Sequence, residues 1–197
     1  MTRGSALSPL SPPSPLLLDH VKELAEASRL GPVLDLACGR GRHALELARR
    51  GIPCIAADRN DGFLRELLER VDAPEERVTP LRTDLETEHG LPFETESCGA
   101  ILVFRFLFRP LASAIASRLA PEGLLLYETF TVGQLAYDYG PRTRAFLLES
   151  GELPRLFPDL EVLDYWEGVS REGPAEGERP EALARLLARK PRAARSG

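Results

Sequence analysis

The strongest constraint on the fold is a series of short apolar segments that contain, or directly precede, an acidic residue. The first segment, Val33–Ala37, contains Asp35 and leads into a glycine turn. The second, residues 52–57, and a third segment of mixed polarity, residues 78–83, are each followed at once by an aspartate. Nearly continuous apolar runs of this length are typical of strands buried on both faces of a sheet. Because segments with helical spacing follow the first two runs, we expect a parallel sheet with helices on both faces.

This alternation of strands and helices continues along most of the chain. Helices are predicted over residues 16–30, from the glycine turn to about Arg50, over 61–71 and over 110–119. Further strands are predicted over residues 100–104, 124–127 and 160–166. Pro80 lacks the backbone N–H that a central strand needs, so its strand is expected at a sheet edge. Residues 129–150 are expected to form an insertion over the sheet, and residues 168–180 a solvent loop.

The segment 182–190 supports two interpretations. Its composition favours a helix by intrinsic propensity. Its place at the end of an alternating chain favours a strand that pairs antiparallel with residues 160–166. We predict the strand.

The composition fits a single globular domain. The chain has 197 residues, of which 43% are hydrophobic and 28% are charged, and a chain of this size can bury a sizeable core. Residues 1–15 are rich in serine and proline and are expected to form a flexible arm. The predicted domain covers residues 16–191, and residues 192–197 are expected to form a flexible tail.

Charge, cysteine content and hydropathy exclude several classes of protein. A formal net charge of −5 argues against nucleic acid as the main partner. The three cysteines form no CxxC pair, so neither a disulfide framework nor a zinc site is indicated. No apolar run approaches the roughly 20 residues that span a bilayer, so no membrane partner is expected. We therefore expect a cytoplasmic protein without a bound metal, and the sequence leaves its oligomeric state open.

Polar residues gather where the predicted strands end. Asp35 lies near the end of the first strand, Gly39 and Gly41 follow it, and Asp58 and Asp84 close the next two strands. Ligands of parallel α/β sheets bind at the carboxyl ends of the strands. The glycines let a ligand approach backbone N–H groups at the start of the next helix. Asp58 is placed to accept from ribose hydroxyls, and Asp84 from an adenine amino group, so we predict one crevice surrounded by these residues.

A dinucleotide would also match part of this pattern. Gly39, Gly41 and Ala44 followed by Asp58 satisfy the dinucleotide fingerprint. Asp35, however, would lie close to the diphosphate and would repel it by about 1 kcal/mol or more. The same carboxylate would attract an ammonium and a sulfonium. S-adenosyl-L-methionine is the ligand whose cationic amino-acid end and ribose hydroxyls would both be bound by carboxylates.

Residues 33–41, with the sequence Val-Leu-Asp-Leu-Ala-Cys-Gly-Arg-Gly, resemble the first motif of class I S-adenosylmethionine-dependent methyltransferases. Asp58, Asp84 and residues 124–127 fall where later motifs of that family fall, and the resemblance covers about residues 16–190. It implies a Rossmann-like fold with a mostly parallel seven-stranded sheet, helices on both faces, the third strand at an edge and an antiparallel final hairpin. It also implies in-line transfer of the sulfonium methyl group to an acceptor.

Within this family, the closest likeness is to small-molecule enzymes of the tellurite-resistance type. It is carried by residues 39–43, Gly-Arg-Gly-Arg-His, and residues 127–130, Tyr-Glu-Thr-Phe. The chain departs from the family at Ala37, where glycine is common, and at Gly99, where aspartate is common. The chain also lacks the Asn-Pro-Pro-Tyr type of motif after the fourth strand, which disfavours adenine and glutamine N-methylation.

The resemblance and the strand-end pattern together nominate site residues. The predicted cofactor-binding residues are Asp35, Ala37, Cys38, Gly39, Gly41, Asp58, Arg59, Asp84, Leu85 and Phe104. The predicted acceptor-binding residues are Arg105, Arg109, Glu128, Tyr137, Tyr139 and Arg142, and Arg144 is a further candidate for an anionic acceptor. A base is needed only if the acceptor must lose a proton. The sequence identifies no clear base. His43 and Tyr127 are the candidates, although His43 is more simply a solvated or capping histidine.

The sequence therefore predicts a methyltransferase that uses S-adenosyl-L-methionine and acts on a small molecule. Two alternatives stay open at this stage. One is an NAD(P)-dependent oxidoreductase that uses the same crevice, and the other is a non-catalytic S-adenosylmethionine-binding protein.

Overall fold

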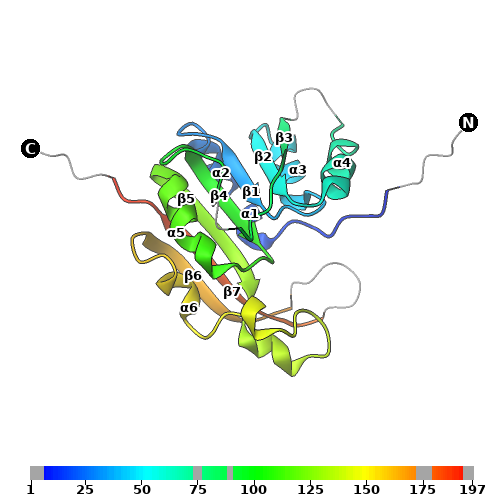
Figure 1. Cartoon of the computed structure of the whole chain (residues 1–197), viewed down its shortest axis with the longest axis vertical. Helices are drawn as coiled ribbons and strands as arrows, with labels where there is room; N and C mark the ends of the chain where they lie inside the picture. The colour runs from blue at the N-terminus through cyan, green and yellow to red at the C-terminus, as the bar shows by residue number, and fades with distance from the viewer. Residues whose placement is uncertain (1–6, 73–76, 88–90, 172–178, 193–197) are drawn as a thin grey trace, which may run out of the picture.

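The computed structural model describes residues 7–72, 77–87, 91–171 and 179–192. Its centre is a seven-stranded sheet with the strand order β3-β2-β1-β4-β5-β7-β6 (Figure 1). The strands are β1 Val33–Leu36, β2 Cys54–Asp58, β3 Val78–Arg82, β4 Cys98–Phe104, β5 Leu119–Phe130, β6 Glu161–Ser170 and β7 Glu181–Arg189. The strands β1 to β5 pair in parallel, whereas β7 runs antiparallel between β5 and β6. The predicted Rossmann-like sheet with a final antiparallel hairpin is confirmed.

The edge position of β3 is also confirmed. Its only partner in the sheet is β2, with Pro80 opposite Ala56. Proline cannot donate to a second neighbour, and at an edge no second neighbour is present. Figure 1 shows β3 next to α4 at one side of the sheet and β6 next to α6 at the other.

The ambiguous segment near the C-terminus is a strand. β7 lies between two neighbours, and most of its residues are buried. A central position satisfies its backbone N–H and C=O groups on both sides and buries side chains such as Leu183 and Leu186. This pairing and burial outweigh the helical propensity of its alanines, leucines and arginines.

The helices cover both faces of the sheet. They are α1 Pro15–Asp19, α2 Val21–Ala27, α3 Arg42–Arg49, α4 Asp61–Leu68, α5 Ala112–Arg118 and α6 Glu152–Arg155, with short 3-10 helices η1 Arg109–Leu111, η2 Val132–Ala136 and η3 Arg144–Phe146. One core cluster contains Leu24, Leu45 and Leu67 from the helices α2, α3 and α4. The other contains Ile115 of α5 and Leu153 of α6. The first four helices therefore pack on one face, and α5 and α6 on the opposite face.

Several predicted boundaries are wrong. The predicted helix 16–30 is divided into α1 and α2 at His20, whose φ of −116° is not helical. β5 has 12 residues and extends well beyond the predicted 124–127. β6 reaches Ser170, so the start of the predicted loop 168–180 is strand, while residues 172–178 lie outside the described residues.

The predicted start of the fold at residue 16 is corrected as well. Ser14 is buried and caps α1, because its Oγ accepts a hydrogen bond from the N–H of Leu16. Sequence analysis placed it in the arm 1–15. The packed fold therefore begins no later than Ser14, and the residues before Leu7 lie outside the described part of the chain.

Candidate functional site

The turn between β1 and α3 has an unusual backbone. Ala37, Gly39 and Gly41 all have positive φ angles, of 53°, 57° and 80°. A Cβ added at Gly41 would lie 2.3 Å from the Leu67 Cδ1 atom of α4, so side-chain packing requires glycine there. A Cβ added at Gly39 would meet nothing within 4 Å. Gly39 therefore leaves open space beside the backbone, as a ligand-binding turn requires.

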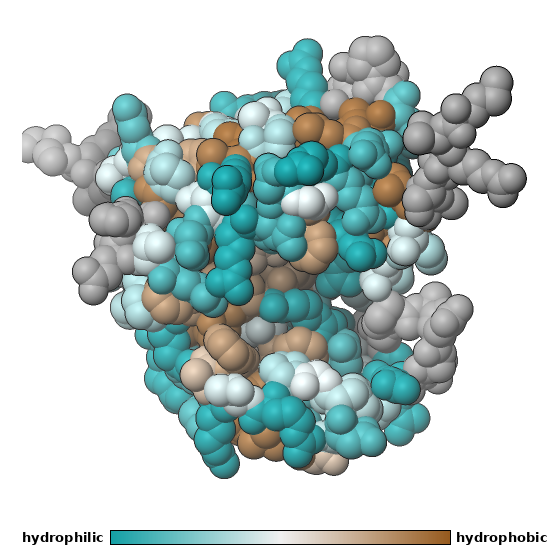
Figure 2. Space-filling model, turned by 45° about the vertical axis from the view of Figure 1, so that its right-hand side comes forward, coloured by the Kyte–Doolittle hydropathy of each residue, from teal (hydrophilic) through white to brown (hydrophobic). Residues whose placement is uncertain are grey.

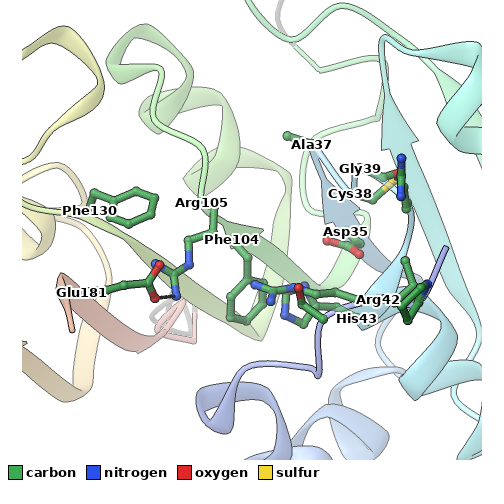
Figure 3. A pocket seen from close by; sticks show the side chains of 14 residues that line it. Asp35, Ala37, Cys38, Gly39, Arg42, His43, Phe104, Arg105, Phe130 and Glu181 are labelled. Carbon is green, nitrogen blue, oxygen red and sulfur yellow. Dashed lines mark hydrogen bonds and ion pairs between the residues drawn. The ribbon is translucent and has the colours of Figure 1, made fainter. Parts of the chain in front are cut away.

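This turn forms one end of a cavity of about 490 Å³, which is called the main cavity below because it borders the glycine turn. Asp35 and the turn residues 37–40 line this end, and Phe104, Arg105, Phe130 and Glu181 line the other (Figure 3). Residues 9–11 contribute a further part of the wall. Figure 2 shows the surface hollowed between the upper body of the molecule and the lower part, which carries the segment after β5.

A second, smaller cavity of about 120 Å³ lies next to it and shares Ala37. Asp58, Arg59, Asp84 and Leu85 line this second cavity. The three carboxylates predicted around one crevice thus line two adjoining cavities: Asp35 lines the main cavity, and Asp58 and Asp84 line its neighbour.

Asp58 connects the two cavities through the backbone. Its Oδ2 accepts a hydrogen bond of 2.8 Å from the N–H of Gly39, and its Oδ1 accepts one of 2.8 Å from the N–H of Asn60. The first bond holds the glycine turn against the end of β2. Arg59 is paired with Glu86 at 3.0 Å, so its guanidinium contributes to the rim of the smaller cavity.

Asp35 is the most perturbed acid of the site. It is 1% exposed, and its Oδ2 has no hydrogen-bond partner among the residues that the structure describes. Burial raises the pKa of Asp35 to about 7, although a hydrogen bond from the backbone of Ala44 and the charge of Arg42 lower it. A buried carboxylate oxygen without a partner, directed into a cavity, is suited to a cationic ligand.

His43 lies on the wall of the main cavity between the two ends. It is 2% exposed, and its ring is stacked on Phe104 with ring centroids 3.8 Å apart. Its Nε2 accepts a hydrogen bond of 3.2 Å from the backbone N–H of Ser14. Burial, with the charges of Arg42 and Arg105, holds the pKa of His43 well below its usual value. The expectation of a solvated or capping histidine is therefore wrong.

The far end of the main cavity carries a buried ionic cluster. Glu128 is 1% exposed, and its Oε2 accepts hydrogen bonds from Ser14 Oγ at 2.8 Å and from Arg185 Nε at 2.7 Å. Arg105 Nε lies 3.4 Å from Glu128 Oε1, and Arg105 Nη2 donates to Glu181 Oε2 at 2.7 Å. This cluster joins the N-terminal segment, β4, β5 and β7.

Several nominated residues lie away from the main cavity. Tyr127 is buried in the core, where its hydroxyl donates to the Phe106 carbonyl and burial raises its pKa. Arg109 is held by Glu152 and by backbone carbonyls. Other nominated residues that are absent from the cavity wall are Tyr137, Tyr139, Arg142 and Arg144. Tyr137 and Tyr139 instead stack on each other, and Arg142 donates to the Tyr137 carbonyl.

Sequence analysis did not nominate several residues that belong to this site, among them Ser14, Arg42, Phe130 and Glu181. Ser14 directly precedes Pro15, a pattern typical of a helix N-terminus, so a capping role was visible in the sequence. Arg42 follows the glycine turn. Glu181 and Phe130 come together with Arg105 through the antiparallel hairpin, which the sequence alone does not place over a cavity.

Comparisons with known proteins agree with this geometry. The family model described as "Methyltransferase domain" matches residues 33–123, from the start of β1 into β5. The match places a methyltransferase domain in residues 33–123. The family and the structural neighbours imply S-adenosylmethionine as the cofactor of the domain. No curated protein sequence matches the chain.

Solved structures share the fold of this methyltransferase domain. TehB from Haemophilus influenzae superposes with a TM-score of 0.69 at 21% identity, over 87% of this chain and 62% of TehB. The present chain therefore spans less than two thirds of TehB. An S-adenosylmethionine-dependent methyltransferase from Methanosarcina mazei gives 0.66 at 16% identity, over 92% of this chain and 100% of that one. The [4+2]-cyclase SpnF gives 0.66 at 17% identity, over 89% of this chain and 81% of that one.

The residues of the methyltransferase domain fit this cofactor. The unpartnered buried oxygen of Asp35 suits a positive charge, and Gly39 leaves room for close approach to the backbone. Among the described residues, no group of three or more His, Cys, Asp or Glu side chains is arranged to hold a metal ion. In the same part of the chain, no helix has both the length and the apolar character needed to cross a bilayer.

Proposed function

We propose that this methyltransferase domain transfers the methyl group of S-adenosylmethionine to a small-molecule acceptor. The observation that carries the proposal is the continuity of the main cavity, which extends from Asp35 and the glycine turn to Phe104, Arg105 and Phe130. Its volume of about 490 Å³ lies within the range of about 300–1,000 Å³ that is usual for small-molecule sites.

The two ends of the cavity suit different parts of the reaction. Asp35 and the backbone at Gly39 would hold the cofactor, with Asp58 and Asp84 nearby for its nucleoside. The cofactor supplies a methyl group activated by a sulfonium. The chain supplies orientation, because an in-line transfer depends mainly on holding the acceptor atom opposite the methyl group.

The wall of the cavity favours an acceptor that loses no proton to the protein during transfer. His43 is the imidazole on this wall, and its Nε2 already accepts the Ser14 N–H. Its pKa is lowered, so the ring is a weak base. An acceptor atom with a free lone pair at neutral pH therefore fits the site better than one that must first be deprotonated.

Calorimetric titration and a methyl-transfer assay test the proposal. We expect S-adenosylmethionine and its product S-adenosylhomocysteine to bind, and NAD not to bind. Asp58→Asn should weaken cofactor binding by about 1–3 kcal/mol, because it disturbs both the turn and the ribose contact. Arg50→Gln, at the exposed C-cap of α3, is the control and should bind like the wild type.

Two outcomes would overturn the proposal. Binding of NAD without binding of S-adenosylhomocysteine would favour the oxidoreductase. Tight binding of S-adenosylmethionine without transfer of labelled methyl to any member of a broad small-molecule panel would favour a non-catalytic binding protein. The cytoplasmic location stays a prediction from the sequence.

A further inference from the structure

Three arginines line the main cavity, of which Arg40 is paired with Glu66 at 3.2 Å, and the other two, Arg42 and Arg105, come from different elements. Arg42 begins α3, and Arg105 directly follows β4 (Figure 3). Both line the main cavity, and the charge of Arg105 contributes to lowering the pKa of Arg42 after burial, its largest cause. Two cations that line one cavity repel each other, and an anion between them would relieve that repulsion.

Arg105 keeps hydrogen-bonding capacity after its protein contacts are counted. Its Nη2 donates to Glu181, and its Nε lies near Glu128. Its Nη1 is buried and has no hydrogen-bond partner within the described part of the chain. A buried guanidinium N–H without a partner is costly, so it is a strong donor for a ligand oxygen.

The backbone fixes Arg105 in this orientation. Its φ is +60°, in the left-handed region that a non-glycine residue seldom adopts. Its N–H donates to the Glu128 carbonyl at 2.8 Å, and its guanidinium lies 4.7 Å from the centre of the Phe130 ring. The guanidinium is therefore held in place before any ligand binds.

The carboxylates around Arg105 are already engaged. Glu128 accepts from Ser14 and Arg185, and Glu181 accepts from Arg105 Nη2. Asp35 lies at the opposite, glycine-turn end of the cavity. The cavity is thus polar along its length, with an acid at the cofactor end and free guanidinium capacity at the other.

We propose that Arg42 and Arg105 bind a carboxylate group of the methyl acceptor, whose apolar body contacts Phe104 and Phe130. This inference rests on the proposed function. A planar carboxylate matches the fork of a guanidinium, which a single ammonium does not. The two phenylalanines line the same cavity, so a flat organic acid is the class of acceptor that satisfies both features.

A matched pair of probes tests the inference by calorimetry. Benzoate and benzamide have the same shape and differ in charge, and each is titrated into protein saturated with S-adenosylhomocysteine. We expect the wild type to bind benzoate at least tenfold more tightly than benzamide. Arg105→Gln and Arg42→Gln should each reduce that preference to below about threefold. Arg50→Gln, at the exposed C-cap of the helix that Arg42 begins, should keep it.

Further titrations test whether the arginines bind the carboxylate of the cofactor instead of a carboxylate of the acceptor. If the arginines hold the carboxylate of the cofactor, Arg105→Gln will weaken the binding of S-adenosylhomocysteine but not that of methylthioadenosine, which has no carboxylate. That result overturns the inference. Equal binding of benzoate and benzamide by the wild type also overturns it. So does sulfate binding that depends on both arginines without a preference for benzoate.

A second variant covers a failure of Arg105→Gln to fold. Arg105→Lys keeps the positive charge and loses the fork, so it should retain part of the preference for benzoate. Full retention in Arg105→Lys together with full retention in Arg42→Gln would contradict the inference. Lack of any S-adenosylhomocysteine binding is a failure of the proposed function instead, and the two results are therefore distinguishable.

Discussion

At the scale of single residues, burial changes the chemistry of Asp35. In water its carboxyl would be ionised at neutral pH, whereas its pKa here is raised to about 7, chiefly by burial. The folded protein therefore keeps a proton on Asp35 between about pH 4 and 7 that the unfolded chain releases. The stability that this proton confers is complete below the unfolded pKa and is lost as the pH rises through the folded pKa.

Asp35→Asn should consequently remove the part of the pH dependence of stability that arises from this carboxyl. The wild type is expected to lose stability relative to the variant from pH 4 to pH 8, by up to about 4 kcal/mol for a shift from 3.8 to about 7. Chemical denaturation of both proteins across this range measures the difference, and the contribution of His43 cancels in the comparison. Parallel stability curves for the two proteins would contradict the assignment of a raised pKa to Asp35.

At the scale of elements, the link between β1 and α3 depends on the approach of α4. Gly41 precedes α3, and its missing side chain makes room for Leu67. The turn, two helices and the ends of β1 and β2 are therefore one packed unit. Its geometry presents the open side of Gly39 to the cavity.

Gly41→Ala should destabilise the protein by about 1–3 kcal/mol, because a Cβ would overlap Leu67 and the backbone has a positive φ. Gly51→Ala is the matched control. Gly51 also has a positive φ, of 75°, but a Cβ there would meet nothing within 4 Å. Thermal unfolding should show a larger loss for Gly41→Ala, and an equal loss in both variants would argue that packing against Leu67 contributes nothing.

At the scale of the whole molecule, Ser14 joins the start of α1 to two distant parts of the chain. Its N–H donates to His43 of α3, its Oγ donates to Glu128 of β5, and the same Oγ accepts from Leu16 at the start of α1. The segment before α1 is thereby fixed next to the main cavity, where residues 9–11 form part of the wall. Arg42, which donates to the Pro12 carbonyl, and Arg70, which donates to the Ser8 carbonyl, hold the same segment.

Ser14→Ala should destabilise the fold by about 1–3 kcal/mol, since a helix cap and a bond to a buried carboxylate are both lost. It should also expose the segment before α1 to proteolysis. Ser28→Ala, whose hydroxyl bonds only to the nearby Ala25 carbonyl, is the control and should change stability by much less. Limited proteolysis and denaturant titration measure both effects, and unchanged protection in Ser14→Ala would contradict this role.

The sequence by itself determined the parts of this protein that depend on neighbours along the chain. Short apolar runs, the Gly39 and Gly41 turn and Pro80 were sufficient to predict the sheet, its edge and a turn with positive φ angles after the first strand. Each of these features can be recognised from a residue and its neighbours in the sequence. An apolar run predicts a buried strand, a glycine permits a positive φ, and a proline lacks the backbone N–H.

Only the tertiary structure decided which charged side chains share the cavity. Of the arginines nominated for the acceptor, Arg105 lines the cavity, while Arg109 is held by Glu152. Arg42 joins it from another element, and Ser14 reaches Glu128 across 114 positions of sequence. The partner and burial of a long polar side chain depend on the elements that pack around it, and no pattern in the neighbouring residues records that packing.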